Sequence, residues 1–74
     1  MNWEDIIISN IEAIIKQRGY LKKAVAERAG FTEQAFSNML NRRKIIKSQD
    51  IPQIANALGC SVMDIFEVSD KKGA

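Results

Sequence analysis

Histidine is absent from this 74-residue sequence, cysteine occurs once, and apolar runs are short. The lone thiol, Cys60, cannot form an internal disulfide. Without histidine no hydrolytic triad of the usual kind can exist, and a zinc site would need carboxylates with a single thiolate. The longest apolar run, Ile6-Ile7-Ile8, is far shorter than the ~20 residues that a membrane span requires. We therefore expect no metal, no cofactor, no membrane contact and no enzymatic activity.

The length of the chain leaves room for one small domain. A domain of this size buries only about 60% of the surface that its unfolded chain exposes, so its stability is expected to be modest. With 46% hydrophobic and 27% charged residues, the composition is that of a globular protein rather than a disordered one. Acidic residues at positions 4 and 5 stand where a secretory leader would be basic, which predicts a cytoplasmic, reduced protein.

Positive charge is concentrated in the middle of the chain. Residues 16–47 carry nine basic and two acidic side chains, a balance of +7, whereas the first fifteen residues carry −3 and residues 48–74 carry −2. The net charge of the whole chain is only +2. A basic segment within a nearly neutral chain is the electrostatic pattern of a nucleic-acid-binding protein, although a solvated basic face would show the same charges.

Apolar residues recur with helical spacing in five segments, and glycines at positions 19, 30 and 59 close three of them, as glycine often does at helix C-termini. The first helix is predicted to begin after Asn2 as its N-cap, with Glu4 and Asp5 in its first turn, where the helix dipole favours negative charge. The apolar stripe that it should bury consists of Trp3, Ile7, Ile11, Ile14 and Ile15, and Ile8 widens one margin of the stripe.

Four shorter helices are predicted to follow. The second covers residues 22–29, the third begins after Thr32 as its N-cap, the fourth begins near Ser48, and the fifth covers residues 62–66 behind Ser61 as its N-cap. The residues that these helices should bury are Val25, Ala26, Ala29, Phe36, Met39, Leu40, Ile51, Ile54, Ala55 and Leu58. No stretch alternates with a period of two long enough for a pair of strands. The predicted fold class is all-α with five helices.

The second and third helices are joined by only a few residues, with Gly30 at the joint. This is the pattern of a helix-turn-helix, in which two helices meet at ~90–120°. Ala26 is small enough to let the two helices approach closely, and Gly30 permits the positive φ of the turn. Phe36 and Met39 would then hold the second helix of the motif against the first.

The sequence also contains three longer stretches, which are Lys16-Gln17-Arg18-Gly19-Tyr20, Val25-Ala26-Glu27-Arg28-Ala29-Gly30-Phe31-Thr32 and Ile54-Ala55-Asn56-Ala57-Leu58-Gly59-Cys60-Ser61. In their order and spacing they resemble the Cro/lambda-repressor-like (Xre-type) helix-turn-helix regulators. Each stretch alone is a weak signal, but together the match extends over residues 5–67. The resemblance implies a lambda-repressor-like DNA-binding domain in residues 1–68, followed by a polar tail in residues 69–74.

Some positions depart from the family pattern. Leu21 stands where the family has a serine or threonine cap, which weakens or replaces that cap. Lys22 replaces a glutamine that contacts a phosphate and braces the third helix; lysine keeps the contact and loses the bracing. Leu40 replaces a frequent glutamate. After the third helix the family prefers glycine, whereas Asn41 and Arg42 follow here, and Asn41 could take the left-handed conformation.

The resemblance implies that the third helix enters the major groove of double-stranded DNA with its N-terminal residues at the base edges. Gln34 and Asn38 lie four residues apart on one face, and an amide can pair with adenine N6 and N7. Glu33 could accept a hydrogen bond from cytosine N4. Exposed amides that meet only solvent are the alternative. The candidate base contacts are Thr32, Glu33, Gln34, Ser37 and Asn38.

Phosphate contacts are expected from basic and amide side chains on either side of the third helix, with backbone N–H groups at the helix starts adding to them. These candidates are Lys22, Lys23, Asn41, Arg42, Arg43 and Lys44. Lys16 and Arg18 are basic too, but are expected to face solvent. Cys60 is expected to pack in the core rather than to sense redox state.

One such helix contacts few base pairs, so the resemblance implies a homodimer on a pseudo-palindromic operator. The candidate dimer contacts are Ile45, Ile46, Val62, Met63 and Phe66. Some of these must belong to the core, and one of the two isoleucines should anchor its loop, so we expect a weak dimer that DNA strengthens. The implied function is a phage- or prophage-type repressor. The alternative is an antitoxin-like or other helix-turn-helix module that binds protein.

Overall fold

The computed structural model describes residues 3–67, and within them the five predicted helices are all present. They are α1 (Trp3–Arg18), α2 (Lys22–Ala29), α3 (Glu33–Leu40), α4 (Asp50–Leu58) and α5 (Val62–Phe66). No strand occurs in this part of the chain, which confirms the all-α prediction. The predicted N-cap Asn2 and the predicted tail at 69–74 lie outside the described residues.

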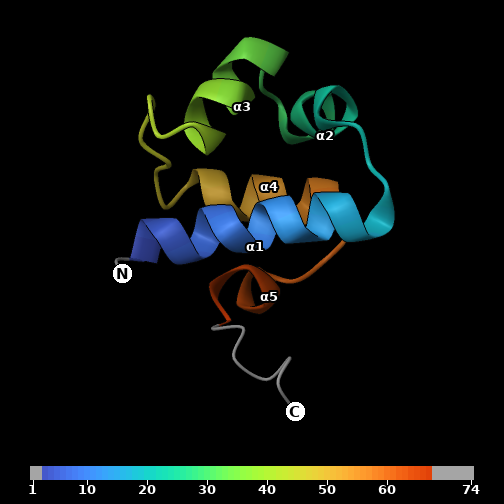
Figure 1. Ribbon diagram of the computed structural model, residues 1–74, viewed down its shortest axis with the longest axis vertical. Coiled ribbons are helices and arrows are strands. Elements are labelled where there is room, and N and C mark those ends of the chain that lie inside the picture. Colours follow the sequence, from blue (N-terminus) through green and yellow to red (C-terminus); the bar gives the residue numbers. More distant parts are fainter. Residues whose placement is uncertain (1–2, 68–74) are drawn as a thin grey trace.

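The helices form layers around α1 and α4 (Figure 1). The pair α2 and α3 lies on one side of α1 and α4, and α5 lies on the other side. The helix α2 packs against both α3 and α4, whereas α5 packs against α1 and α4. The helix-turn-helix is therefore one end of the molecule, and the short last helix is the opposite end.

The turn of the helix-turn-helix has the local structure that its residues predict. Gly30 ends α2 with φ +88°, a left-handed conformation that glycine adopts at no steric cost. Two residues later the Thr32 hydroxyl oxygen accepts a hydrogen bond from the Ala35 N–H at 3.0 Å and caps α3. Ser61 and Asp64 form a complete capping box at the start of α5.

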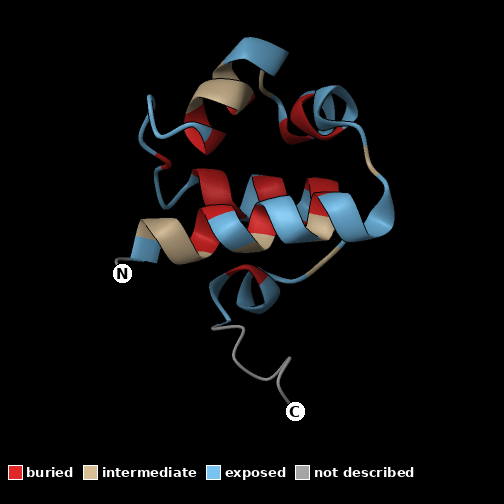
Figure 2. Ribbon diagram, viewed as in Figure 1, coloured by how far each residue is buried: buried red, intermediate tan, exposed pale blue. Residues whose placement is uncertain are grey.

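The core lies between the helices, on the sides that they turn toward one another (Figure 2). Ile7, Ile11, Ala26, Phe36 and Ile54 have no solvent exposure at all. Every residue of α2, α3 and α4 that the sequence predicts to be buried is buried. Cys60 is partly buried against this core, in agreement with a packing role.

Trp3 departs from the prediction, because 51% of its surface is exposed. It occupies the first position of α1, where the helix begins, and a large indole is seldom fully buried. Ile8 takes a full place in the core instead. The stripe on α1 is thus displaced toward Ile8, with Ile14 only partly buried against the core.

The start of α4 also differs from the prediction. The helix begins at Asp50 rather than near Ser48. The buried Asp50 carboxylate accepts a hydrogen bond from the Lys47 N–H at 3.0 Å, which fixes the entry into the helix. A carboxylate in the first turn is also favoured by the helix dipole.

Two polar side chains of α1 fasten the later helices to it. Asn10 donates hydrogen bonds to the backbone carbonyls of Ile65 and Glu67, at the end of α5. Arg18 is exposed, as expected, but its Nη1 also donates to the Leu58 carbonyl at 2.9 Å. A helix leaves its last carbonyls without partners inside the helix, and Arg18 satisfies one of these in α4.

We expect Ala26→Leu to destabilise the fold, because Ala26 is completely buried in the helix that packs against α3 and α4. Overpacking a core commonly costs ~1–3 kcal/mol of unfolding free energy. In a domain of this size each kcal/mol lowers the melting temperature by roughly 4–8 °C. Ala24→Leu on the exposed side of α2 is the matched control, and thermal unfolding followed by circular dichroism is the measurement. Equal melting temperatures for the two variants would contradict the close approach at Ala26.

Candidate nucleic-acid interface

The outer side of α3 carries the residues predicted to contact bases. Its inner side is anchored by Phe36, Met39 and Leu40, all of which are buried. This packing turns the polar side chains outward: Thr32, Glu33 and Gln34 are exposed, and Ser37 and Asn38 are partly buried. The five predicted base-contact residues therefore share the accessible side of one helix at one end of the molecule.

Two hydrogen bonds join side chains along this side of α3. Gln34 Nε2 donates to Asn38 Oδ1 at 3.1 Å, one helical turn further on. Asn41 Nδ2 donates to Ser37 Oγ at 3.4 Å with the same spacing. The amides predicted to read bases are thus in contact with one another, which the sequence spacing allowed but did not establish.

The start of α2 is basic and lacks a side-chain cap. Leu21, at the N-cap position, makes no capping hydrogen bond, as its apolar side chain predicts, and the first turn contains no acidic residue. Lys22 and Lys23 are both exposed there. The N-terminal N–H groups of a helix and two lysines are together suited to an anion such as a phosphate.

The segment after α3 forms a tight turn whose backbone N–H groups are already used. The N–H groups of Arg43 and Lys44 both donate to the Asn38 carbonyl, at 2.8 and 3.2 Å. The side chains of Asn41, Arg42, Arg43 and Lys44 are all exposed. Any phosphate contact at this turn must come from these side chains rather than from the bonded backbone.

The left-handed residue of this turn is Arg42, not Asn41. Arg42 has φ +64°, whereas Asn41 has φ −90° and ψ 6°. The expectation for Asn41 is wrong because the helical hydrogen bonding continues through Asn41, whose N–H donates to the Ser37 carbonyl, and the chain turns one residue later. Left-handed backbone is strained for a residue with a Cβ.

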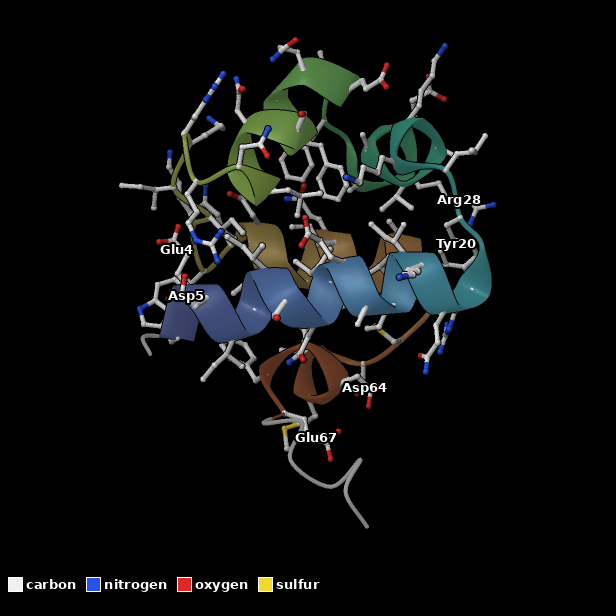
Figure 3. The ribbon with its side chains drawn as sticks, viewed as in Figure 1. Glu4, Asp5, Tyr20, Arg28, Asp64 and Glu67 are labelled. Atoms are coloured by element: carbon white, nitrogen blue, oxygen red, sulfur yellow. The ribbon has the colours of Figure 1, made fainter. Side chains whose placement is uncertain are left out.

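Arg42 is also joined to the first helix. Its Nε donates to Asp5 Oδ1 at 2.8 Å, and both side chains remain partly exposed, at 53% and 37%. Asp5 lies at the N-terminal end of α1 (Figure 3). No sequence signal links two residues so far apart.

Acidic side chains are the minority around the helix-turn-helix, where residues 21–47 contain seven basic residues and only Glu27 and Glu33 as acids. Basic side chains lie at the start of α2 and in the turn after α3. Asp64 on α5 and Glu67 directly after it lie on the side of α1 opposite to α3 (Figure 3). The two ends of the molecule therefore differ in charge, and the positive end is the one that carries the exposed amides.

Other chemistry has little support in the described part of the chain. No group of three metal-ligating side chains occurs in residues 3–67. Burial first, and then the charge of Asp64, raise the pKa of the Cys60 thiol, with Arg18 opposing them. A raised pKa keeps the thiol protonated and unreactive near neutral pH. No helix among these residues is long and apolar enough to cross a membrane.

The candidate dimer contacts are not brought together. Ile46 is buried in the core and cannot meet a partner, whereas Ile45 is 71% exposed, so one of the pair does anchor the loop as predicted. Val62, Met63 and Phe66 are exposed on α5, on the far side of α1 from the loop that holds Ile45 (Figure 1). Met63 and Phe66, together with Asp64 and Glu67, line a pocket of about 240 Å³.

Comparison with known proteins agrees with this architecture. The family model of the Cro/C1-type HTH DNA-binding domain matches residues 10–71. The fold is similar to the crystal structure of a hypothetical transcription factor, NHTF, from Neisseria, with a TM-score of 0.84 and 17% sequence identity over 96% of this chain and 82% of that one. No curated protein matches the sequence. The family match covers most of the chain, and the chain belongs to the Cro/C1-type helix-turn-helix DNA-binding domain family.

Proposed function

We propose that this protein is a sequence-specific transcriptional regulator of the phage or prophage repressor type. It acts in the cytoplasm without catalysis, by occupying an operator in double-stranded DNA. The observation that carries this proposal is the exposed, amide-bearing side of α3 with basic side chains on either side of it. An α-helix fits the major groove, where each base pair presents its own pattern of donors and acceptors.

The proposed base contacts follow from the chemistry of the α3 side chains. The amides of Gln34 and Asn38 can donate to and accept from base edges, and adenine is their usual partner. The Glu33 carboxylate accepts from cytosine N4 but repels phosphate, so it contributes to specificity more than to affinity. Thr32 and Ser37 carry hydroxyl groups that can contact either kind of base pair.

The proposed phosphate contacts flank these residues. They supply affinity and fix the orientation of the protein on DNA but carry no sequence information of their own. One group lies at the start of α2 and the other in the turn after α3. This arrangement is expected when α3 lies in the major groove, between the sugar-phosphate backbones of the two DNA strands. The residues are Lys22, Lys23, Asn41, Arg42, Arg43 and Lys44.

The proposed operator complex is a dimer. A single helix-turn-helix reads few base pairs, and two copies on a pseudo-palindrome would place their third helices about one helical turn, ~34 Å, apart. Of the candidate dimer contacts, the exposed ones are Ile45, Val62, Met63 and Phe66. The exposed apolar residues and pocket on α5 equally suit the rival function, an antitoxin-like module that binds another protein.

Selection from random DNA, followed by a salt titration, tests the proposed function. We expect one preferred sequence whose affinity falls steeply with salt, because about six phosphates would be neutralised and the log–log slope would be near −5. Fluorescence anisotropy with the selected site and with a scrambled site is the measurement. A flat salt response, or no enriched sequence at all, would contradict the proposal.

Arg42→Gly should weaken DNA binding while leaving the stability of the fold nearly unchanged. Glycine removes left-handed strain of ~1–2 kcal/mol. Against this stand the loss of an exposed ion pair, ~0.2–1 kcal/mol, and a more flexible unfolded chain, ~0.4–1 kcal/mol. We therefore expect the unfolding free energy to change by less than about 1 kcal/mol, while the salt slope for DNA binding decreases by about one.

Arg43→Ala is the control for Arg42→Gly, because it removes a neighbouring charge at a residue without a positive φ. It should lower the salt slope by a similar amount, about one, without relieving backbone strain. Chemical denaturation and anisotropy titrations on both variants provide the two measurements. An unchanged salt slope for Arg42→Gly would exclude Arg42 from the phosphate contacts.

The dimer makes a prediction about stoichiometry. Sedimentation at micromolar concentration should show mostly monomer, or a mixture, for the free protein and two protomers on each selected DNA site. Met63→Asp should reduce the complex to one protomer, because Met63 is 77% exposed on α5 and a charge there opposes apolar contact. Ala13→Asp on the exposed surface of α1 is the control. A strict one-to-one complex of the unaltered protein would favour the protein-binding rival.

A further inference from the structure

We propose that Gln34 and Asn38 read DNA as one hydrogen-bonded unit across two adjacent base pairs, rather than as two independent amides. This inference rests on the proposed function and concerns its specificity. The observation behind it is the bond from Gln34 Nε2 to Asn38 Oδ1, 3.1 Å long, on the outer side of α3. The two side chains that are best suited to base recognition thus contact each other before any DNA is present.

The bond changes what each amide can offer to a base. An isolated amide presents an oxygen acceptor and an NH₂ donor, which together match adenine N7 and N6. In the pair, the Asn38 oxygen already accepts and one Gln34 N–H already donates. Each of these two groups keeps one further bonding position, but the groups left entirely free are the oxygen of Gln34, which is an acceptor, and the NH₂ of Asn38, which is a donor.

This arrangement predicts a pattern on the DNA. The Gln34 oxygen requires an amino group in the major groove, which adenine N6 or cytosine N4 supplies. The Asn38 NH₂ requires an acceptor, which guanine N7 and O6, adenine N7 or thymine O4 supply. The preferred site should therefore place an amino-bearing base next to an acceptor-bearing edge, and each choice should depend on both residues.

The backbone around Asn38 favours a fixed unit. The backbone carbonyl of Asn38 accepts hydrogen bonds from the N–H groups of both Arg43 and Lys44. These two bonds hold the turn after α3 against the backbone of Asn38. Phe36, between the two amides in sequence, is completely buried and prevents α3 from rolling about its axis. Asn38 is itself partly buried whereas Gln34 is exposed, so Asn38 is the more confined of the two side chains.

Coupling between the two amides should become strong only on DNA. On an exposed helix a pair of this kind contributes little to stability, because water competes for both groups. In the groove that water is displaced, and removing one partner leaves the other with an unsatisfied donor or acceptor. The loss of either residue should therefore remove most of the contribution of the pair.

A double-mutant cycle on the selected DNA site tests the proposal. The proteins are the unaltered chain, Gln34→Ala, Asn38→Ala and the double variant, each titrated on the selected site and on every single base-pair change of it. We expect each single variant to weaken binding by roughly 5- to 150-fold. The affinity of the double variant should be about that of the single variant with the lower affinity. Each single variant should lose sequence preference at the same two adjacent base pairs.

Gln17→Ala is the matched control, because it removes an exposed amide on α1 that lies outside the proposed DNA contacts and leaves Gln34 and Asn38 unchanged. Its preference at the two base pairs should stay that of the unaltered protein, and melting curves should show that all variants fold. A double variant whose loss equals the product of the two single losses would overturn the proposal and leave the proposed function standing. Single variants that each lose sequence preference at a different base pair would also overturn the proposal. A chain with no preferred sequence would overturn both.

Discussion

The packing of α2 against α3 and α4 sets the orientation of everything at the positive end of the molecule. Both α2 and α3 have only eight residues, and helices of that length are marginal in water when isolated. Their stability must therefore come from burial, and α2 offers only Val25, Ala26 and Ala29 for this purpose. Because these side chains are short, α2 and its neighbours can approach closely. The side of α3 that faces outward therefore depends on the contacts of these three residues of α2.

Several positions near this end are unfavourable for local structure. Lys22 and Lys23 stand at the start of α2, where the helix dipole opposes positive charge, and Leu21 supplies no cap. Arg42 occupies a left-handed conformation that would suit glycine better. All three charged residues belong to the proposed phosphate contacts. Departures from local rules that gather on one surface are typical of functional sites, where binding rather than stability selects the residue.

Periodicity and capping chemistry were sufficient to predict the five helices and most of the core. They act between residues a few positions apart, so Thr32, Ser61 and the buried residues of α2 to α4 could be identified from the sequence. Contacts between distant segments carry no such signal. The bond of Arg18 to α4 and the ion pair of Arg42 with Asp5 depend on how helices meet in space.

The same reasoning explains Trp3 and the two loop isoleucines. Hydrophobicity alone made Trp3 equivalent to the other apolar residues of α1, but its place at the end of the helix leaves it exposed. Hydrophobicity also predicted that one of Ile45 and Ile46 anchors the loop, but only the packing shows that the buried one is Ile46. For the candidate site, the sequence predicted which residues of α3 share a side. It could not predict that two of them, Gln34 and Asn38, are bonded to each other.

The two hydrogen bonds from Asn10 to α5 have a consequence for the order of folding. The first bond joins two residues that are 55 positions apart in the sequence, and the second joins two that are 57 positions apart. The contacts within the helix-turn-helix, in contrast, close short loops. Bringing distant segments together costs more chain entropy than closing a short loop, and non-local contacts slow folding. A five-residue helix such as α5 has too few internal bonds to form alone. Docking of α5 onto α1 should therefore come last, so the end of the protein that lies opposite α3 is the final part to acquire its structure.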